Sequence, residues 1–472
     1  MTYRKYLSIL FASFCVVLTF LAPPSEASTI RVLLANGVSS AVISSARSVS
    51  LQDASGKRTT HPHSVHCTPV SSRSVLVDGK MRTLPLTLSS SAPLAFGKAR
   101  YRGAIRVVPA RAGLSVINVV DSETYLRGVL KMEANPAWPT EALKAQAIVS
   151  RTYALRRVSG SGGREYDVSD SIESQVYRGV NAEDPRCDAA IRSTAGLILS
   201  YAGAVAFTPF HSDSGGNTAD IRDVWGGSYP YLSGAKEPIA YDSPNSSWKT
   251  RLPAATVESI LSRMNKSVGR VTNVTAQSSD AAGRAVTLLV SGSNGRVTVR
   301  AHDFRMAAGP SVLRSTAFSI TPEGDSSVPR KSGAMTAGST NRAISPTPAQ
   351  EKSRIIPVSS TPMSFREEEA LTALTEKGVF SAEELIDMLK RPETRKGYLI
   401  EAINRSKNGA PQGIATIVPA NASGGQSFLF TGRGWGHGVG MSQWGAKSLA
   451  ESGWTYTKIL QHYFPGTELT RR

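Results

Sequence analysis

Residues 125–155, YLRGVLKMEANPAWPTEALKAQAIVSRTYAL, decide the fold that this sequence predicts. Pro136 and Pro139 lack an amide hydrogen and push the residues before them out of the helical region, so a first helix should end near Glu133. Pro139 also suits the first turn of a second helix, where an amide would have had no partner. The sequence therefore predicts a helix pair that holds the carboxylate of Glu133 at its junction.

The second predicted helix is apolar around most of its circumference, which is typical of a helix buried in the protein. Its polar residues form two groups. Gln146, Ser150 and Tyr153 lie at helical spacing and are candidates to face a cleft, whereas Lys144 and Arg151 share another face. A core helix with two solvated cations is the competing interpretation.

The sequence before the helix pair, residues 29–120, has the pattern of β-strands joined by turns. Short β-branched runs such as IRVLLANG and LSVINVV are bounded by Gly, Asn, Asp and Pro. His61, His63, His66 and Cys67 gather there, and such side chains can bind zinc. A polar loop is the simpler interpretation, because nothing else in the sequence pairs with the cluster at a recognised spacing.

After the helix pair, the runs LILSYAG and AVAFTPF predict a hairpin turning at residues 202–204. The hairpin should deliver residues 211–218 as a loop, and loops on a rigid sheet are where ligand-contacting residues concentrate. Gly215 and Gly216 allow a positive backbone angle or a close backbone approach. His211 and Ser214 are therefore candidate site residues, although a tight turn that merely needs glycine fits the same pattern.

The same loop also resembles the nucleophile loop of chymotrypsin-like serine proteases. Ser214 in DSGG would be the nucleophile and His66 beside Cys67 the histidine, in the chain order of those enzymes. The long alanine-rich helix pair between them argues against a double β-barrel. The protease alternative also leaves the C-terminal motif unexplained.

That motif is the glycine-rich segment at residues 430–449, FTGRGWGHGVGMSQWGAKSL. Its alternating glycines let the backbone turn closely and are expected to bring Arg433 and His437 toward one spot. Ser442 can cap the helix that follows, with Gln443 in its first turn.

EANPAWPTEALKAQAIVSRTYAL, the QVYRG run with Gln175 and Tyr177, and GHGVGMSQ together resemble the SpoIID/LytB domain family, the stage II sporulation protein D type of peptidoglycan-processing proteins. The resemblance covers most of residues 95–321 and 427–469. It implies an α+β, β-rich SpoIID-like domain with a buried helix pair carrying a catalytic Glu, which is Glu133. The substrate-binding candidates are Gln146, Arg151, Tyr153, Gln175, His211, Ser214, Arg433, His437 and Gln443.

Some members of this family bind zinc near the loop that matches residues 211–218, through histidines and cysteines. This chain keeps His211 but has no cysteine there. We therefore expect no metal and no cofactor.

Composition predicts the organisation of the whole chain. Residues 1–27 read as a signal peptide, so the protein is expected in the periplasm or another extracytoplasmic space that faces the cell wall, and at a membrane only if the signal stays uncleaved. The SpoIID-like domain should occupy residues 28–321 and 427–472. Residues 322–363, rich in Ser, Thr and Pro, should be a disordered linker. Residues 364–426 should form a small helical insert that begins a helix at the Ser381–Glu384 capping box.

The charge balance indicates the kind of partner. Lys plus Arg number 54 against 36 acidic residues, a formal net charge of +18, which favours association with a polyanion. Nucleic acid, anionic lipid and the cell wall are the candidate polyanions, and export makes nucleic acid the least suitable of them. The family resemblance implies peptidoglycan glycan strands as the partner. A cell-wall amidase and division proteins are the candidate partners of the helical insert.

A single carboxylate limits the chemistry. Hydrolases of glycosidic bonds usually need two carboxylates, whereas a lytic transglycosylase can use one as acid and then as base. Glu133 would then need a raised pKa, and the residues expected to supply an apolar setting are Met132, Ala134, Pro136 and Trp138. The candidates for a second carboxylate are Glu141, Asp213 and Asp223.

Three functions fit the sequence. The first is a lytic transglycosylase that cleaves MurNAc–GlcNAc strands, by resemblance strands denuded of stem peptides, to 1,6-anhydro-MurNAc ends during division or septation. The second is a non-catalytic glycan binder that activates an N-acetylmuramoyl-L-alanine amidase. The third is a structural module that binds the wall and recruits division proteins. The intact Glu133 favours the first.

Overall fold

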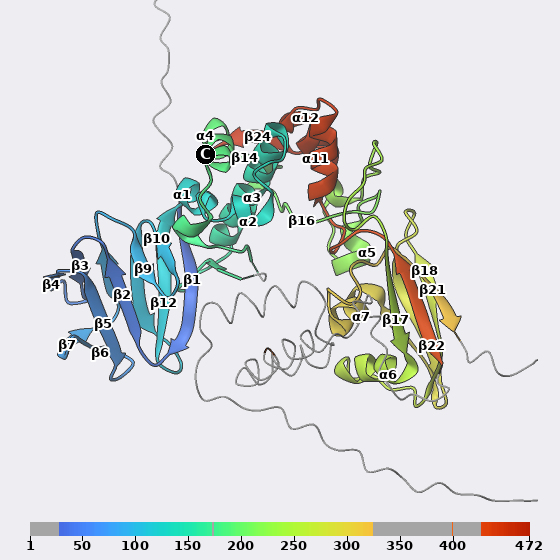
Figure 1. Cartoon of the computed structure of the whole chain (residues 1–472), viewed down its shortest axis with the longest axis horizontal. Helices are drawn as coiled ribbons and strands as arrows, with labels where there is room; N and C mark the ends of the chain where they lie inside the picture. Colours follow the sequence, from blue (N-terminus) through green and yellow to red (C-terminus); the bar gives the residue numbers. More distant parts are fainter. Residues whose placement is uncertain (1–27, 172–173, 324–398, 400–425) are drawn as a thin grey trace, which may run out of the picture.

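The computed structural model describes residues 28–171, 174–323, 399 and 426–472. Figure 1 shows an N-terminal β-rich part, a central part with most of the helices, and a second β-rich part on the other side of it. The described residues form three main hydrophobic cores. This arrangement confirms the predicted α+β, β-rich class. The proposed signal peptide, nearly all of the linker and nearly all of the helical insert lie outside the described residues.

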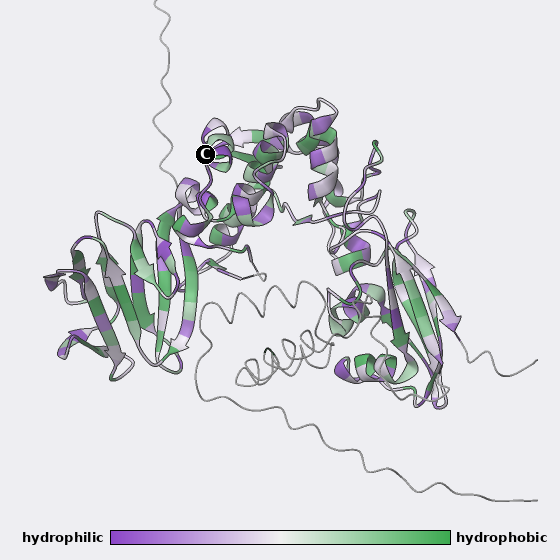
Figure 2. Cartoon of the chain, viewed as in Figure 1, coloured by the Kyte–Doolittle hydropathy of each residue, from purple (hydrophilic) through white to green (hydrophobic). Residues whose placement is uncertain are grey.

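The N-terminal part is built from two sheets packed through one apolar core. Their strand orders are β13-β1-β12-β11-β8-β3-β4 and β10-β9-β2-β5-β6-β7. Along β2 and β3 buried and exposed residues alternate, as a strand with one face on the core requires, and Figure 2 shows the resulting apolar bands. The strands are β1 (Thr29–Val38), β2 (Ala41–Ser45), β3 (Val49–Gln52), β4 (Arg58–His61), β5 (Ser64–Pro69), β6 (Ser74–Val77), β7 (Lys80–Thr83), β8 (Leu86–Ser89), β9 (Leu94–Phe96), β10 (Ala99–Tyr101), β11 (Ala104–Pro109), β12 (Leu114–Asp121) and β13 (Val168–Ser169).

The predicted helix pair is present, with its first helix in two pieces. These are α1 (Ser122–Arg127) and α2 (Leu130–Glu133), and they are followed by α3 (Thr140–Ser159). The break falls at Gly128, the C-cap of α1, where an added side chain would collide with the ring of Tyr177. The helix ends at Glu133 as predicted, and Pro139 lies one residue before the predicted position, as the N-cap of α3.

The central part adds short elements around α3. It contains the hairpin predicted near residues 202–204, formed by β14 and β15, with β24 on the other edge of β14. The additional elements are η1 (Gly179–Ala182), α4 (Pro185–Ser193), β14 (Leu197–Tyr201), β15 (Ala204–Val205), β16 (Phe210–His211), α5 (Ile221–Trp225), η2 (Pro230–Leu232), β23 (Met441–Ser442), α11 (Gln443–Glu451), α12 (Tyr456–Tyr463) and β24 (Glu468–Arg471). In the part of the chain that the structure describes, no helix combines the length and apolarity needed to cross a bilayer.

The second β-rich part joins segments from both sides of the undescribed region. Its elements are β17 (Trp248–Pro253), α6 (Ala254–Arg263), β18 (Val271–Ser279), β19 (Ala285–Gly292), β20 (Gly295–Arg300), α7 (Ala301–Ala308), β21 (Phe318–Glu323) and β22 (Ser427–Gly432). β22 lies between β17 and β21. The predicted domain boundary shifts as a result: Pro322 and Glu323, expected to open the linker, pair with Phe428 and Ser427. Gln426, expected to end the insert, accepts a hydrogen bond from the amide of Ala254.

The glycine-rich segment runs from β22 into the central part. It ends in β23, which pairs in parallel with β16 so that His211 lies opposite Ser442. Ser442 caps α11 as predicted, accepting from the amide of Gly445. This short pairing places the first residue of α11, Gln443, beside the end of α2.

Candidate active site

A cleft of about 530 Å³ lies where α2, α3, β16 and the start of α11 meet. Six of the ten predicted site residues line it, namely Glu133 and five of the substrate-binding candidates. The lining residues are Glu133, Tyr153, Arg157, Ser174, Gln175, Val176, Phe207, Pro209, Phe210, His211, Ser212, Trp225, His437 and Gln443. Among these described residues only Glu133 carries a carboxylate.

Glu133 sits at the last position of α2 with its side chain part-buried. The amide of Val176 donates a long hydrogen bond, 3.4 Å, to its Oε1. Burial raises the pKa of Glu133 to about 7, and the hydrogen bonds from Val176 and Gln443 lower it by less. A carboxyl group with such a pKa can hold its proton near neutral pH and also accept one, which suits both halves of acid–base catalysis.

The apolar surroundings of Glu133 include the buried Ala134, as expected, and several residues that were not expected. Met132 is 44% exposed, and Trp138 packs edge-on against Trp444 with ring centroids 5.4 Å apart. The apolar cleft lining is instead supplied by Phe207, Pro209, Phe210 and Trp225. Sequence reasoning missed these residues because their approach to Glu133 depends on the pairing of β16 with β23.

Gln443 and Gln146 support the end of α2. Gln443 Nε2 donates to the backbone carbonyl of Glu133 at 2.9 Å and lies 3.4 Å from Gln146 Oε1. Gln146 in turn donates to Ser150 Oγ at 3.1 Å. Gln146 and Ser150 are therefore buried behind Gln443. Of the three polar residues on α3 that were predicted to face a cleft, Tyr153 lines it.

Gln175 and His211 line the cleft, and each has a buried side-chain nitrogen without a partner among the described residues. Gln175 is 1% exposed and its Oε1 accepts from the hydroxyl of Tyr125, while Nε2 has no partner among the described residues. His211 is 5% exposed, and its Nδ1 lies 3.2 Å from the carbonyl of Val439, which assigns the ring proton to Nδ1. Nε2 is then an acceptor, likewise without a partner in the described structure. Burial keeps the pKa of His211 well below its usual value, so the ring is neutral.

His437 and Arg433 do not meet, contrary to the prediction. Both ring nitrogens of His437 bond to backbone, Nε2 to the carbonyl of Phe210 at 2.9 Å and Nδ1 to the amide of Val439 at 3.0 Å. Its ring packs on Trp225, with centroids 4.7 Å apart. Arg433 points elsewhere and donates to the carbonyl of Gly215 at 2.7 Å. His437 therefore forms part of the cleft wall. The hydrogen bond of Arg433 links the glycine-rich segment to the loop that contains Gly215.

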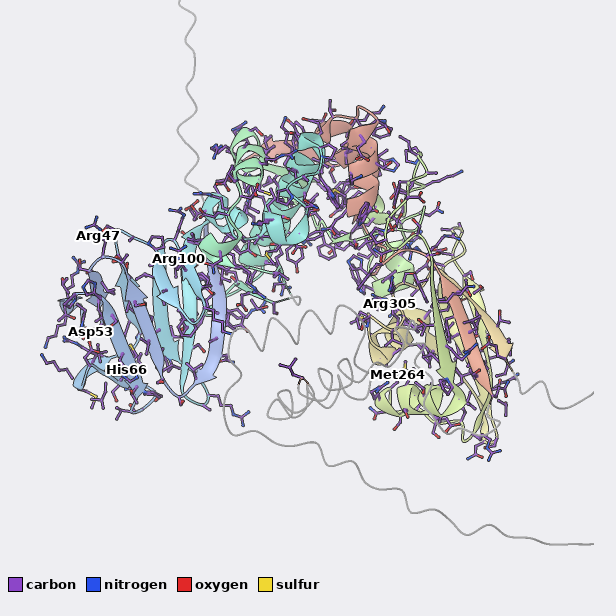
Figure 3. All side chains as sticks on the ribbon, in the orientation of Figure 1. Arg47, Asp53, His66, Arg100, Met264 and Arg305 are labelled. Atoms are coloured by element: carbon purple, nitrogen blue, oxygen red, sulfur yellow. The ribbon has the colours of Figure 1, made fainter. Side chains whose placement is uncertain are left out.

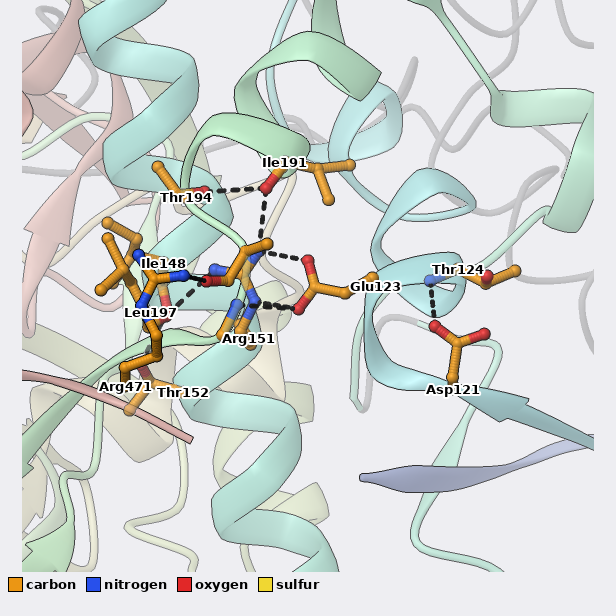
Figure 4. Close-up of polar contacts among 12 residues, drawn as sticks. Asp121, Glu123, Thr124, Ile148, Arg151, Thr152, Ile191, Thr194, Leu197 and Arg471 are labelled. Carbon is orange, nitrogen blue, oxygen red and sulfur yellow. Dashed lines mark hydrogen bonds and ion pairs between the residues drawn. The ribbon is translucent and has the colours of Figure 1, made fainter. Parts of the chain in front are cut away.

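Arg151 and Ser214, predicted to bind substrate, are buried away from the cleft. Figure 4 shows Arg151 in a bidentate interaction with Glu123, in which Nε and Nη2 of the arginine each lie 2.7 Å from a carboxylate oxygen. Arg151 also donates a hydrogen bond to the carbonyl of Leu197. Ser214 is 1% exposed and its Oγ donates to Glu237 at 3.0 Å. The interpretation of Arg151 as a solvated or substrate-facing cation was wrong, because Glu123 lies on α1 directly opposite.

The candidates for a second carboxylate lie outside the cleft lining. Glu141 pairs with Lys144 at 2.7 Å. Asp213 is 1% exposed and accepts hydrogen bonds from Tyr241 and Ser243. Asp223 belongs to α5 and is absent from the described lining. The positive φ angles expected at Gly215 and Gly216 are present, at 68° and 105°.

The protease and metal alternatives find no support in the geometry. His66 lies on β5 of the N-terminal part, far from the cleft (Figure 3), while the hydroxyl of Ser214 is engaged by Glu237. His61 pairs with Asp78, its Nδ1 2.9 Å from the carboxylate. Within the described residues, no group of three His, Cys, Asp or Glu side chains is placed to hold a metal ion.

The protein has an α+β fold, and one carboxyl group lines its cleft among the described residues. The raised pKa of that group lets it hold or accept a proton near neutral pH. A family model described as "SpoIID: Stage II sporulation protein" matches residues 110–201, which include Glu133 and α3. The resemblance to the SpoIID/LytB family that the motifs predicted is thereby confirmed for the part of the chain that carries Glu133 and α3.

Three relatives show how much of this chain is similar to other proteins. It is 28% identical over 221 residues to an uncharacterised protein of Brachyspira hyodysenteriae, 26% over 345 residues to the amidase enhancer of Bacillus subtilis, and 28% over 174 residues to stage II sporulation protein D of Bacillus subtilis. These alignments cover 47%, 73% and 34% of this chain. They span 59%, 40% and 51% of the relatives, so the chain matches about half of their length.

Proposed function

We propose that this protein is a lytic transglycosylase of peptidoglycan glycan strands, with Glu133 as its acid and base. The observation that carries the proposal is a lone carboxyl group, part-buried in a cleft, whose pKa burial raises to about 7. The match of residues 110–201 to the SpoIID family model, with the alignments to the amidase enhancer and stage II sporulation protein D, supports a substrate from the cell wall. The formal net charge of +18 favours an anionic polymer.

The reaction needs one residue that gives a proton and then takes one. Glu133 protonates the oxygen that joins C1 of N-acetylmuramic acid to C4 of N-acetylglucosamine, and the C1–O bond breaks. The 6-hydroxyl of the muramoyl residue then bonds to C1, while the Glu133 carboxylate takes its proton. The products are a 1,6-anhydromuramoyl end and a free 4-hydroxyl, and the acid is regenerated without water or a second carboxylate.

The cleft offers sugar-binding groups beside the acid. Trp225, which is 38% exposed, and Phe207 present aromatic surface suited to stacking on a pyranose face. Gln175 Nε2 can donate and His211 Nε2 can accept, so an acetamido group or a hydroxyl would satisfy both atoms. Binding of sugar would then remove two buried unsatisfied groups.

A second candidate function is activation of a cell-wall amidase. It is favoured by the alignment to the Bacillus subtilis protein named amidase enhancer, which covers 73% of this chain. In that case the cleft would bind glycan without cutting it. The Glu133→Gln variant would then stimulate an added amidase as well as the wild type does.

Digestion of peptide-free glycan strands, followed by mass spectrometry, tests the two candidates. A transglycosylase releases fragments with 1,6-anhydromuramoyl ends, and the Glu133→Gln variant does not. Hydrolysed reducing ends from the wild type would instead contradict the proposed chemistry. An amidase activator releases neither product but speeds removal of stem peptides when an amidase is added.

A further inference from the structure

A second cavity, which we call the arginine pocket, adjoins the cleft at the last turn of α3. It has a volume of about 210 Å³ and lies among residues 153–167, 207 and 229. Tyr153, Arg157 and Phe207 line both the pocket and the cleft, so the two hollows adjoin at these side chains. A substrate held at Glu133 can therefore extend a branch into the pocket.

The pocket carries an uncompensated positive charge. Arg156, Arg157 and Arg164 line it, against one carboxylate, that of Asp167. Asp167 already accepts hydrogen bonds from the guanidinium of Arg31, at 2.6 Å and 3.1 Å. Arg31, which does not line the pocket, therefore neutralises the charge of this carboxylate. Within the described residues, none of the three lining arginines forms an ion pair.

Two of these arginines are fixed by the backbone and one is free. Arg156 donates to the carbonyl of Val205 at 2.6 Å and stacks over the ring of Phe207. Arg164 donates to the carbonyl of Ser161 at 3.1 Å. Arg157 is exposed, and its guanidinium forms no hydrogen bond with any described residue, although it lines both the pocket and the cleft. A planar guanidinium in that state suits bidentate binding of a carboxylate.

The glycan that the proposed function assigns to the cleft carries one kind of carboxyl group that could bind there. Its sugar rings are neutral, and the acidic group is the lactyl ether on each muramoyl residue. In an intact strand this carboxyl group forms an amide bond with the stem peptide. Removal of the peptide by hydrolysis of that amide leaves a free carboxylate on a short, flexible arm.

We propose that the arginine pocket binds the free lactyl carboxylate of a peptide-free muramoyl residue, with Arg157 as its direct partner. This inference rests on the proposed function for the identity of the polymer. It makes Arg157 a specificity determinant: the pocket favours denuded residues over residues that still carry peptide. The fixed charges of Arg156 and Arg164 add a field that favours the same anion.

Binding by the Glu133→Gln variant tests this assignment, because it needs no turnover. The probes are a peptide-free oligosaccharide, the same oligosaccharide with its carboxylates converted to methylamides, and the peptide-bearing oligosaccharide. We expect the free acid to bind about tenfold more tightly than the methylamide, as one charge-assisted bidentate contact implies. Adding Arg157→Gln should remove that preference. Adding Arg111→Gln, which deletes an exposed charge at the turn between β11 and β12, should keep it.

The outcomes separate this inference from the proposed function. Equal binding of acid and methylamide, no measurable binding of the acid, or a preference that survives Arg157→Gln would overturn the pocket assignment. Peptide-bearing strands that bind best and depend on Arg157 would also overturn it, in favour of a stem-peptide carboxylate. An Arg157-dependent preference without any anhydromuramoyl product from the wild type would refute the transglycosylase and leave the pocket assignment standing. Matching thermal midpoints show that the variants are folded.

Discussion

Gln443 donates its side-chain amide to the main-chain carbonyl of Glu133 across 310 residues of sequence, at 2.9 Å. This bond joins the first residue of α11 to the last residue of α2, so the glycine-rich motif holds the acid in place. Ser442, which caps the same helix, is paired to His211 through the β16–β23 bridge. Motifs that lie far apart in the chain therefore meet at one carboxyl group.

Replacing Gln443 by Ala should impair catalysis more than binding. The carbonyl of Glu133 loses its partner and the carboxyl group is less well oriented, so we expect kcat to fall about 10- to 100-fold. The free energy of unfolding should fall by about 1 kcal/mol. Steady-state kinetics on peptide-free glycan measures the first effect and chemical denaturation the second. The exposed Gln52 of β3 is the matched control; an equal loss of kcat in Gln52→Ala would contradict a specific role for Gln443.

The pH dependence of activity follows from the raised pKa of Glu133. Burial raises this pKa to about 7, and the proposed reaction begins with the protonated form. The rate should therefore decline above pH 7, by about tenfold for each pH unit. A pH–rate profile on peptide-free strands gives the test. A rate that keeps rising above pH 8 would show that the acid form is not the active one.

Stability should depend on the same group with a defined sign. The pKa of Glu133 is raised above its ordinary value of 4.5, so the folded state binds the proton more tightly than the unfolded state does. Its favourable contribution is complete below about pH 4.5 and is lost as pH rises through about 7. Glu133→Gln removes this loss and should be more stable than wild type well above pH 7 by about 3 kcal/mol. Denaturant titrations at several pH values check this; a constant difference between the two proteins would contradict it.

Arg151 and Arg157 lie on the same helix but should behave oppositely on mutation. Arg151→Ala leaves Glu123 without its bidentate partner, and we expect the free energy of unfolding to fall by about 3 to 5 kcal/mol. Arg157→Ala removes an exposed side chain without a described partner and should change it by less than about 0.5 kcal/mol. Comparable destabilisation of the two variants would refute the structural assignment of Arg151.

Gly445 tests the packing of α11 against the buried carboxyl of Glu237. Alanine usually stabilises a helix relative to glycine by about 1 kcal/mol. At Gly445, however, an added Cβ would collide with the hydroxyl of Tyr463 and with the Glu237 carboxylate. Gly445→Ala should therefore destabilise the protein, by about 2 kcal/mol. Gly160, where the nearest atoms to an added Cβ are 3.6 and 3.8 Å away, is the control.

Local features of the site were predictable from sequence because they depend on neighbouring residues. Pro136 and Pro139 fix the end of α2 at Glu133, Ser442 caps α11, and Gly215 adopts the expected positive φ. Each of these depends on a few consecutive residues and their backbone preferences.

Long-range features were not predictable in the same way. Phe207 and Phe210 line the cleft because β16 pairs with β23, whose sequence lies about 230 residues further on. Arg151 is buried because Glu123 lies on α1, a position that helical periodicity within α3 alone does not reveal. The division of residues 28–321 into several cores likewise depends on β22 returning between β17 and β21.

The most direct test of the account is mass spectrometry of peptide-free glycan strands incubated with the wild type and with Glu133→Gln. The account predicts fragments ending in 1,6-anhydromuramic acid from the wild type and none from the variant. Intact strands in both reactions, or the same anhydro products from both, would contradict the assignment of Glu133 as the catalytic acid.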